Sequence, residues 1–256
     1  MTSARARVSA FWDAHINAWL AGGDPLPSSL LRWFKGYKGV GEGEPTLDGF
    51  PEPFHGDLLG QVREPRMVVL GLNPGKFHDR FQARDSLFAE EIRKEGSYSS
   101  WATTFPYDRD PWIAHMGINK YYRDRLRFTR NWLEDPAADH RDLLIFEFYP
   151  WHSTKIQGEM KPPTKIIDEF VWQPIAELPV QQVFAFGRPW DNLAQTILPQ
   201  TDKLGLGGRP YGSQKVSRAV RIYELPSGKQ LVVEWHSGGA GPPSAEETAV
   251  LRKEFA

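Results

Sequence analysis

One short run of residues joins an apolar segment to a turn of the kind that binds ligands. Gly71-Leu72-Asn73-Pro74-Gly75 follows directly on the apolar run Met67-Val68-Val69-Leu70. Glycine permits tight turns and the close approach of a ligand, and Pro74 restrains Asn73 toward an extended conformation. The amide of Asn73 is therefore expected at the carboxyl end of a strand, where open α/β sheets bind their ligands. A purely structural turn is the alternative for so short a motif.

Polar, aromatic and glycine residues also follow three later apolar runs. The first run contains Glu147 and continues to His152, a candidate for lining a pocket. The second ends in Gly187-Arg188, and the third ends in Trp235-His236 before a glycine-rich loop. If these runs are parallel strands of one sheet, their ends meet at one edge and form a crevice for a ligand.

The run Gly71-Leu72-Asn73-Pro74-Gly75-Lys76-Phe77 resembles the first motif of the uracil-DNA glycosylase superfamily. It is most similar to the single-strand-selective monofunctional branch, and next to the mismatch-specific uracil/thymine branch. The resemblance implies that Asn73 positions or activates the hydrolytic water and that Phe77 stacks on a base flipped out of the DNA. Gly71 would allow that base to approach the backbone closely. The similarity extends from about residue 50 to the end of the chain.

A second motif supports the same resemblance. Trp235-His236-Ser237-Gly238 is similar to the His-Pro-Ser motif of the glycosylases, with the proline missing. The resemblance implies that His236 donates a hydrogen bond to the pyrimidine O2 and stabilises the leaving base anion. In the family the following loop wedges into the duplex, and here that loop contains Ser237, Gly238 and Gly239.

One position departs from the pattern of the uracil enzymes. They carry an asparagine on the second strand, where the apolar pattern of this chain places Glu147. An ionised glutamate offers only hydrogen-bond acceptors, whereas an amide offers a donor and an acceptor. Glu147 would accept from the amino group of a cytosine-type base and would repel O4 of uracil. The residue therefore favours a cytosine derivative, unless it pairs with a nearby Arg or backbone group.

Candidate contacts to DNA phosphates lie outside these two motifs. The run Val183-Phe184-Ala185-Phe186-Gly187-Arg188 is similar to a Gly-Arg pattern of several glycosylase branches, which makes Arg188 one candidate. The stretch Lys120–Arg130 is basic and aromatic, and it supplies Arg123 and Arg127 as further candidates. An ordinary solvated helix face is the alternative for this stretch.

Composition limits the classes of protein to which the chain can belong. The 256 residues are 40% hydrophobic and 25% charged, with a net charge of -1, which is typical of one globular domain. The absence of cysteine excludes disulfides, zinc-thiolate sites and the iron–sulfur cluster that two glycosylase branches carry. No apolar run approaches a membrane span and no signal peptide is visible, so a cytoplasmic protein without a membrane partner is expected.

Hydrophobic periodicity predicts a single domain over residues 1–256, with an N-terminal helical and loop extension over about residues 1–65. The predicted strands are Met67–Leu72, Leu143–Tyr149, Gln182–Phe186 and Gln230–Trp235, with an antiparallel strand at Val216–Leu225. Helices are predicted from Ser3 to Gly22 and at Asp79–Lys94, Pro111–Leu133, Thr164–Glu177, Trp190–Leu198 and Ser244–Phe255. This alternation predicts the α/β class, as a three-layer α/β/α sandwich around a central, mainly parallel four-stranded sheet.

The motifs together predict a monofunctional DNA glycosylase that hydrolyses the N-glycosidic bond of a damaged or modified base. A modified cytosine, as in phage DNA, is the substrate that Glu147 favours, and a uracil-type base is the other. Neither a cofactor nor a metal is expected, and DNA with a flipped base is the expected partner of a monomer. Two alternatives stay open: a non-catalytic nucleic-acid-binding module on the same fold, and a hydrolase of nucleosides or nucleotides.

Overall fold

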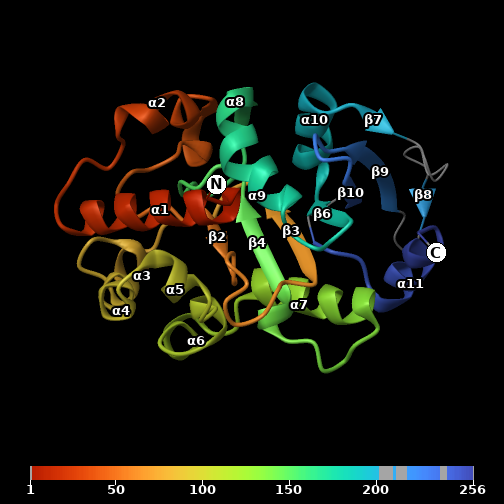
Figure 1. Ribbon diagram of the computed structural model, residues 1–256, viewed down its shortest axis with the longest axis horizontal. Coiled ribbons are helices and arrows are strands. Elements are labelled where there is room, and N and C mark those ends of the chain that lie inside the picture. The colour runs from red at the N-terminus through yellow and green to blue at the C-terminus, as the bar shows by residue number, and fades with distance from the viewer. Residues whose placement is uncertain (1, 202–209, 212–217, 237–240, 256) are drawn as a thin grey trace.

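A computed structural model describes residues 2–201, 210–211, 218–236 and 241–255 of the chain (Figure 1). The predicted α/β class is confirmed, since helices alternate with the strands of a mixed, eight-stranded sheet. Its strand order is β2-β4-β3-β6-β10-β9-β7, with β8 beside β9. A separate two-stranded sheet joins β1 (Tyr37–Gly39) to β5 (Gly158–Met160) in antiparallel fashion.

The strands predicted from continuous apolar runs lie in the middle of the large sheet. They are β3 (Met67–Gly71), β4 (Leu143–Glu147), β6 (Gln182–Phe186) and β10 (Gln230–His236), and their mutual pairings are parallel. The sheet is nevertheless larger and more mixed than the four-stranded sheet predicted. Antiparallel strands extend it on both sides: β2 (Phe54–His55), β9 (Arg218–Glu224), β7 (Gln200–Thr201) and β8 (Pro210–Tyr211).

The N-terminal region is more regular than a loop. Helix α1 (Ala4–Leu20) begins after Ser3, whose hydroxyl accepts from the Ala6 amide as the sequence predicts. The part of the predicted helical and loop extension that follows α1 contains α2 (Ser28–Phe34), the 3₁₀ turn η1 (Gly41–Gly43), β1 and β2. The tryptophans Trp12, Trp19 and Trp33 of α1 and α2 are buried, so this extension is part of the main core.

Two predicted helices are each divided, because polar caps and glycine interrupt them. The first becomes α3 (Asp79–Gln82) and α4 (Leu87–Glu95), since Ser86 caps α4 by accepting from the Ala89 amide. The second becomes α6 (Trp112–Met116) and α7 (Lys120–Leu133), separated by Gly117 at φ 74°. Helix α5 (Tyr98–Ala102) and the 3₁₀ turns η2 (Pro106–Asp108) and η3 (His140–Asp142) lie between the predicted elements.

Helices cover both faces of the sheet. Along β9 the hydroxyl of Tyr223 donates to Asp191 on α10 (Arg188–Ile197), at 2.8 Å. Arg218, an odd number of residues away, instead reaches Glu247 on α11 (Ala245–Lys253) at 2.9 Å. Because side chains alternate along a strand, α10 and α11 lie on opposite faces. Ser244 and Glu247 form a capping box at the start of α11, where the sequence predicts a helix.

The remaining helical segment follows β5 and precedes β6. It runs through α8 (Thr164–Ile167), the π-helical η4 (Asp168–Trp172) and α9 (Gln173–Ala176) without a break. In Figure 1, α8 and α10 lie toward the top of the view, where β4 ends, and α7 lies below. None of the helices in the described part of the chain is long and apolar enough to cross a membrane.

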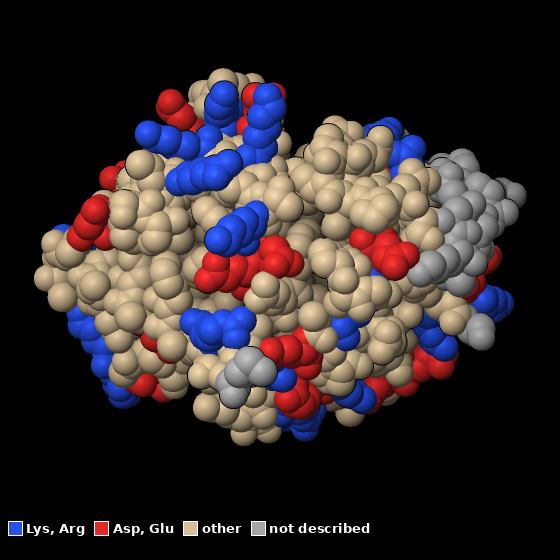
Figure 2. All heavy atoms as spheres, turned by 45° about the horizontal axis from the view of Figure 1, so that its top comes forward, with Lys and Arg blue, Asp and Glu red and all other residues tan. Residues whose placement is uncertain are grey.

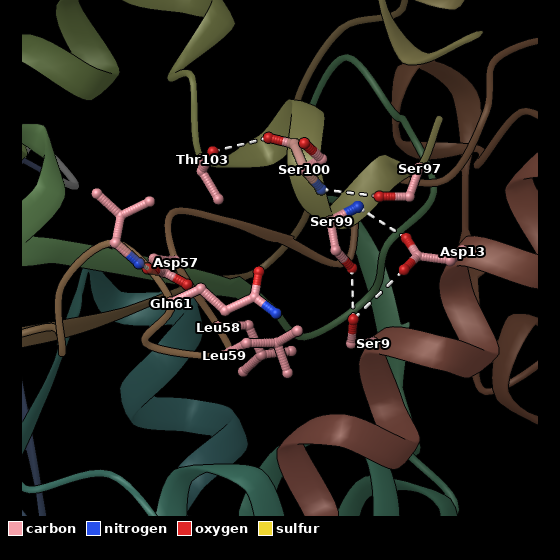
Figure 3. Close-up of a pocket in the computed structure, with 11 residues that line it drawn as sticks. Ser9, Asp13, Asp57, Leu58, Leu59, Gln61, Ser97, Ser99, Ser100 and Thr103 are labelled. Atoms are coloured by element: carbon pink, nitrogen blue, oxygen red, sulfur yellow. Dashed lines mark hydrogen bonds between the residues drawn. The ribbon is translucent and has the colours of Figure 1, made fainter. Parts of the chain in front are cut away.

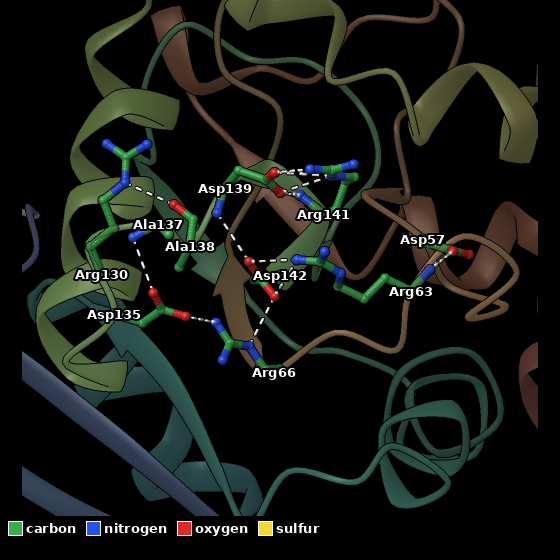
Figure 4. Close-up of polar contacts among 10 residues, drawn as sticks. All are labelled: Asp57, Arg63, Arg66, Arg130, Asp135, Ala137, Ala138, Asp139, Arg141 and Asp142. Carbon is green, nitrogen blue, oxygen red and sulfur yellow. Dashed lines mark hydrogen bonds and ion pairs between the residues drawn. The ribbon is translucent and has the colours of Figure 1, made fainter.

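An ionic network closes the amino edge of the central strands (Figure 4). Asp142, which directly precedes β4, is fully buried. Its carboxylate accepts from Arg66 Nε at 2.9 Å and from Arg63 Nη1 at 3.2 Å. Breaking a buried ion pair by removing one partner is strongly destabilising, so this network fixes the start of β4. The strand-end site residues predicted from the sequence lie at the opposite, carboxyl edge.

Candidate functional site at the carboxyl edge of the sheet

Three of the predicted residues follow neighbouring central strands at the carboxyl edge of the sheet. Leu70 of β3 is paired with Ala185 of β6, and Ala185 is paired with Val233 of β10. Asn73, Arg188 and His236 each stand three residues beyond this row. Of the three, His236 is the last residue of β10, whereas Asn73 lies two residues beyond β3 and Arg188 begins α10.

The amide of Asn73 is held in one orientation by the loop that follows β4. Its Nδ2 donates to Ser153 Oγ at 2.7 Å and to the Ser153 carbonyl at 3.2 Å. Among the residues that the structure describes, none donates a hydrogen bond to Oδ1. The side chain is half-buried. Asn73 therefore presents a fixed acceptor, which is the property needed to orient a water or a ligand N–H group.

Glycine at position 71 is required by the neighbouring carboxyl group. Gly71 is paired with Glu147 across β3 and β4, and a Cβ atom at residue 71 would overlap the Glu147 carboxyl. The Glu147 side chain is buried, with 1% of its surface exposed. Its Oε1 accepts from the Tyr121 hydroxyl at 3.1 Å, while Oε2 has no hydrogen-bond partner. Gly71 thus makes room for a carboxyl group at the end of the strand.

Burial changes the chemistry expected of Glu147. Removal from water raises the pKa of Glu147 to about 8, although the charge of Arg125 and the Tyr121 hydroxyl act in the opposite direction. At neutral pH the group is therefore mainly a carboxylic acid, with one donor and one acceptor face. The acceptor-only carboxylate assumed in the sequence analysis is thus a poor description of this residue.

Arg125 belongs to the interior and not to the surface of α7. Its guanidinium lies 3.2 Å from the centroid of the Tyr121 ring, and its Nη1 donates to the Tyr121 carbonyl at 3.0 Å. The predicted phosphate contacts Arg123 and Arg127 are exposed, but both lie 3.5 Å from the carboxylate of Asp124. Their positive charge is partly balanced, which weakens the expectation that α7 binds phosphate.

A cavity of about 310 Å³ opens beside Asn73. This volume lies within the usual range for small-molecule sites. Four aromatic side chains form much of its wall, at Tyr107, Trp112, Tyr121 and Tyr122. The polar and loop residues that complete the wall are Asn73, Pro74, Gly75, Lys76, His78, Gln82 and Asn119. A planar ring could stack on such aromatic faces while amide groups contact its polar edge.

Phe77 follows Asn73 in the same loop, and His152 packs against that loop at Gly75. Neither residue lines this cavity. Their ring centroids are 6.1 Å apart, and His152 Nδ1 is 3.3 Å from the Gly75 carbonyl oxygen. Gly75 itself has φ 85°, the left-handed conformation that glycine adopts readily. The structure therefore brings Asn73, Phe77 and His152 together around the motif. Glu147 does not line the cavity, and its hydroxyl partner Tyr121 does.

No protein family and no curated protein matches this sequence. The likeness of the Asn73 and His236 motifs to the glycosylases stays a prediction that rests on the residues themselves. His236 is half-buried at the end of β10. The predicted wedge residues Ser237, Gly238 and Gly239 lie outside the described residues. Arg188 is described and has 63% of its side chain exposed; it stacks over Trp235, at 5.2 Å from the ring centroid.

A buried carboxylate behind the cavity was not singled out by sequence reasoning. Glu52 is fully buried and accepts from the Tyr107 hydroxyl at 2.5 Å. His55 Nε2 lies 2.7 Å from its Oε2, and His152 Nε2 lies 3.3 Å from its Oε1. Burial alone would raise the pKa of Glu52, but the nearby His152 ring and the hydrogen bond from His55 lower it to about 2. The residue therefore stays ionised and links the cavity wall to the Asn73 loop.

The other cavities offer less chemistry. One of about 290 Å³ between α1 and α5 is lined by several hydroxyls and by Asp13 and Asp57 (Figure 3). Asp13 accepts from the Ser99 amide at 2.7 Å, and Asp57 accepts from the amides of Val62 and Arg63. Both carboxylates thus stabilise local backbone. Within the described ranges, no group of three or more His, Asp or Glu residues could hold a metal ion.

Proposed function

We propose that the protein is a monofunctional DNA glycosylase, which hydrolyses the N-glycosidic bond of a damaged or modified base bound at the Asn73 cavity. The observation that carries the proposal is the aromatic cavity of about 310 Å³ beside a fixed asparagine acceptor at the end of β3. A flipped base needs stacking faces and edge contacts, and this wall offers both. The three-layer arrangement, the monomeric state and the cytoplasmic location are parts of the same proposal.

The chemistry requires only groups that the chain supplies. The oxygen of a water molecule forms a bond to C1′ of the sugar, the bond from C1′ to the base nitrogen breaks, and its electron pair leaves with the base. The proton that the water loses is taken up by the base anion. The Asn73 Oδ1 would orient that water by accepting one of its hydrogens. His236, at the same edge of the sheet, would donate to the departing base. A preorganised donor of this kind is worth about 2.7–4 kcal/mol in comparable sites.

A protonated Glu147 widens the range of bases that the site could recognise. A carboxylic acid can donate to N3 of cytosine and accept from its amino group. It can equally accept from N3–H of uracil and donate to O4. The contact with Tyr121 must open for either pairing, because Oε1 is already hydrogen-bonded. A modified cytosine therefore stays in the proposal beside uracil-type bases, with weaker support from Glu147 than the sequence alone suggests.

The test is a panel of oligonucleotides that each carry one modified base in a single- or double-stranded context. Incubation with the protein followed by alkali should cleave the strand at the modified position, because hydrolysis leaves an abasic site. The same preparation with Asn73→Ala is the matched control against a contaminating glycosylase. Intact strands across the whole panel, in a preparation that binds the oligonucleotides, would refute the catalytic proposal.

A non-catalytic nucleic-acid-binding module is the second candidate. It is favoured by the position of Glu147, which is shielded behind Tyr121 and does not line the cavity. A module of this kind would retard a labelled oligonucleotide in a gel without forming alkali-labile sites. A hydrolase of free nucleosides would instead release the base from a nucleoside in the absence of DNA.

A further inference from the structure

A second group of positive charges lies beside the site, partly on the N-terminal extension and partly on the segment around β5. The segment 28–40, which includes α2 and β1, contains three Lys and Arg residues and no Asp or Glu. Residues 155–165 around β5 bring further cations next to it, because β1 and β5 pair with each other. Together these form an N-terminal basic surface of six exposed residues: Arg32, Lys35, Lys38, Lys155, Lys161 and Lys165.

This surface is clearly visible on the outside of the molecule. Figure 2 shows Lys and Arg side chains gathered at the upper left of the face drawn, with fewer Asp and Glu side chains among them. Two of its cations have acidic partners: Lys155 pairs with Glu42, and Lys161 Nζ lies 2.6 Å from Glu159 Oε1. Lys35, Lys38 and Lys165 have no ion pair with any residue of the described ranges, so a net positive charge is left.

The N-terminal basic surface is joined directly to the Asn73 site. Ser153, which accepts from Asn73, donates through Oγ to the Lys155 carbonyl at 2.9 Å. That carbonyl also accepts from the Tyr37 hydroxyl of β1 at 3.2 Å. Two residues of chain span at most about 7 Å, so the backbone of Lys155 lies close to Ser153, the residue that holds the Asn73 amide. Lys76, in the motif loop, acts electrostatically on Glu42 together with Lys155.

We propose that the N-terminal basic surface binds the phosphates of the DNA strand whose base enters the Asn73 cavity. That the bound molecule is DNA rests on the proposed function. The location of the positive charge on this surface does not. The alternative surface on α7 is weaker, because Arg123 and Arg127 share Asp124 and Arg125 is buried. Lysine is suited to this task as a flexible point charge that need not match a fixed geometry.

The experiment compares the salt dependence of binding for two charge-matched triple variants. Lys35→Ala, Lys38→Ala and Lys165→Ala remove three charges of the surface that have no ion pair with any residue of the described ranges. The control variant removes three exposed charges elsewhere, at Lys94, Arg141 and Lys253. Binding to a labelled, unmodified single strand is followed by fluorescence anisotropy over a range of salt. Each lost phosphate contact lowers the slope of log affinity against log salt by about 0.7, so the first variant should lose about 2 units.

Three results would overturn the inference. The first is a wild-type slope in the surface variant, and the second is an equal loss in the control variant. The third is a loss that appears only when Arg123 and Arg127 are replaced, which would assign the phosphates to α7. Because the probe carries no modified base, the measurement is independent of excision. If the surface variant shows a smaller slope of log affinity against log salt and the wild-type protein cleaves no substrate, this inference stands and the proposed glycosylase activity is refuted.

Discussion

Replacing Glu147 by glutamine tests the protonation state on which recognition of a base depends. Glutamine keeps the shape of the acid and can keep the Tyr121 contact, but it cannot ionise. The pKa of Glu147 is near 4.5 in the unfolded chain and about 8 in the folded protein. Between these values the folded state holds a proton that the unfolded state has lost. The free energy of unfolding of the wild type therefore falls as pH rises through this window.

The magnitude follows from the difference between the two pKa values. One pKa unit corresponds to 1.36 kcal/mol, so Glu147 should remove about 4–5 kcal/mol of stability between about pH 4.5 and pH 8. Glu147→Gln should match the wild type within about 1 kcal/mol at pH 5. At pH 8 the variant should be the more stable protein, by roughly 3–4 kcal/mol.

Urea denaturation at several pH values between 5 and 8, followed by tryptophan fluorescence, measures this difference. The exposed Glu169→Gln is the control for a general change of net charge. A difference between variant and wild type that does not change with pH would refute the reasoning. It would show that Arg125, which lowers the pKa of Glu147, keeps the carboxylate ionised inside the protein.

Three further predictions concern the same edge of the sheet. Asn73→Ala should slow excision at least about 100-fold in single-turnover cleavage while the melting temperature barely changes, because the residue is a half-buried acceptor at a strand end. Equal rates for variant and wild type would remove Asn73 from the mechanism. Gly71→Ala should destabilise the protein by about 1–3 kcal/mol in urea, because the methyl group would overlap the Glu147 carboxyl. Adding Glu147→Ala should recover part of that loss, and no recovery would place the clash elsewhere. Glu52, whose pKa lies near 2 in the folded protein and near 4.5 when unfolded, should contribute stability that is full above about pH 4.5 and lost as pH falls toward 2. In acid titrations Glu52→Gln should flatten this part of the curve, and an unchanged slope would contradict the role of Glu52 as a buried anion.

The central strands could be predicted because their residues are apolar without interruption. Met67–Leu70 and Leu231–Val233 are buried throughout, so each reads as a continuous hydrophobic run. The two-residue strands β2, β7 and β8 are too short to show any periodicity. Strand pairing also depends on partners distant in sequence, and the antiparallel pairing of Phe54 with Phe146 is an example. Local pattern therefore identifies the core of this sheet and underestimates its width.

The candidate site was accessible to sequence reasoning only in part. Asn73 stands out because Gly and Pro residues surround it at the end of an apolar run. Glu52 gives no such signal, since its role comes from burial beside His55 and His152. Pro51 and Pro53 on either side of Glu52 were the available indication that this segment is held rigidly. The burial of Arg125 was also unpredictable, because it depends on stacking against Tyr121.

The short strands at the two sides of the large sheet have a consequence for how copies of the protein meet. An edge strand exposes unpaired N–H and C=O groups that can template pairing with another chain, and this leads to aggregation. Here the outermost strands are β2 on one side and β7 and β8 on the other, with two residues each. None of the three offers enough backbone to extend the sheet into a neighbouring molecule. Strands this short show no periodicity in the sequence. For the same reason they limit edge-to-edge pairing between copies of a sheet rich in valine, leucine and phenylalanine.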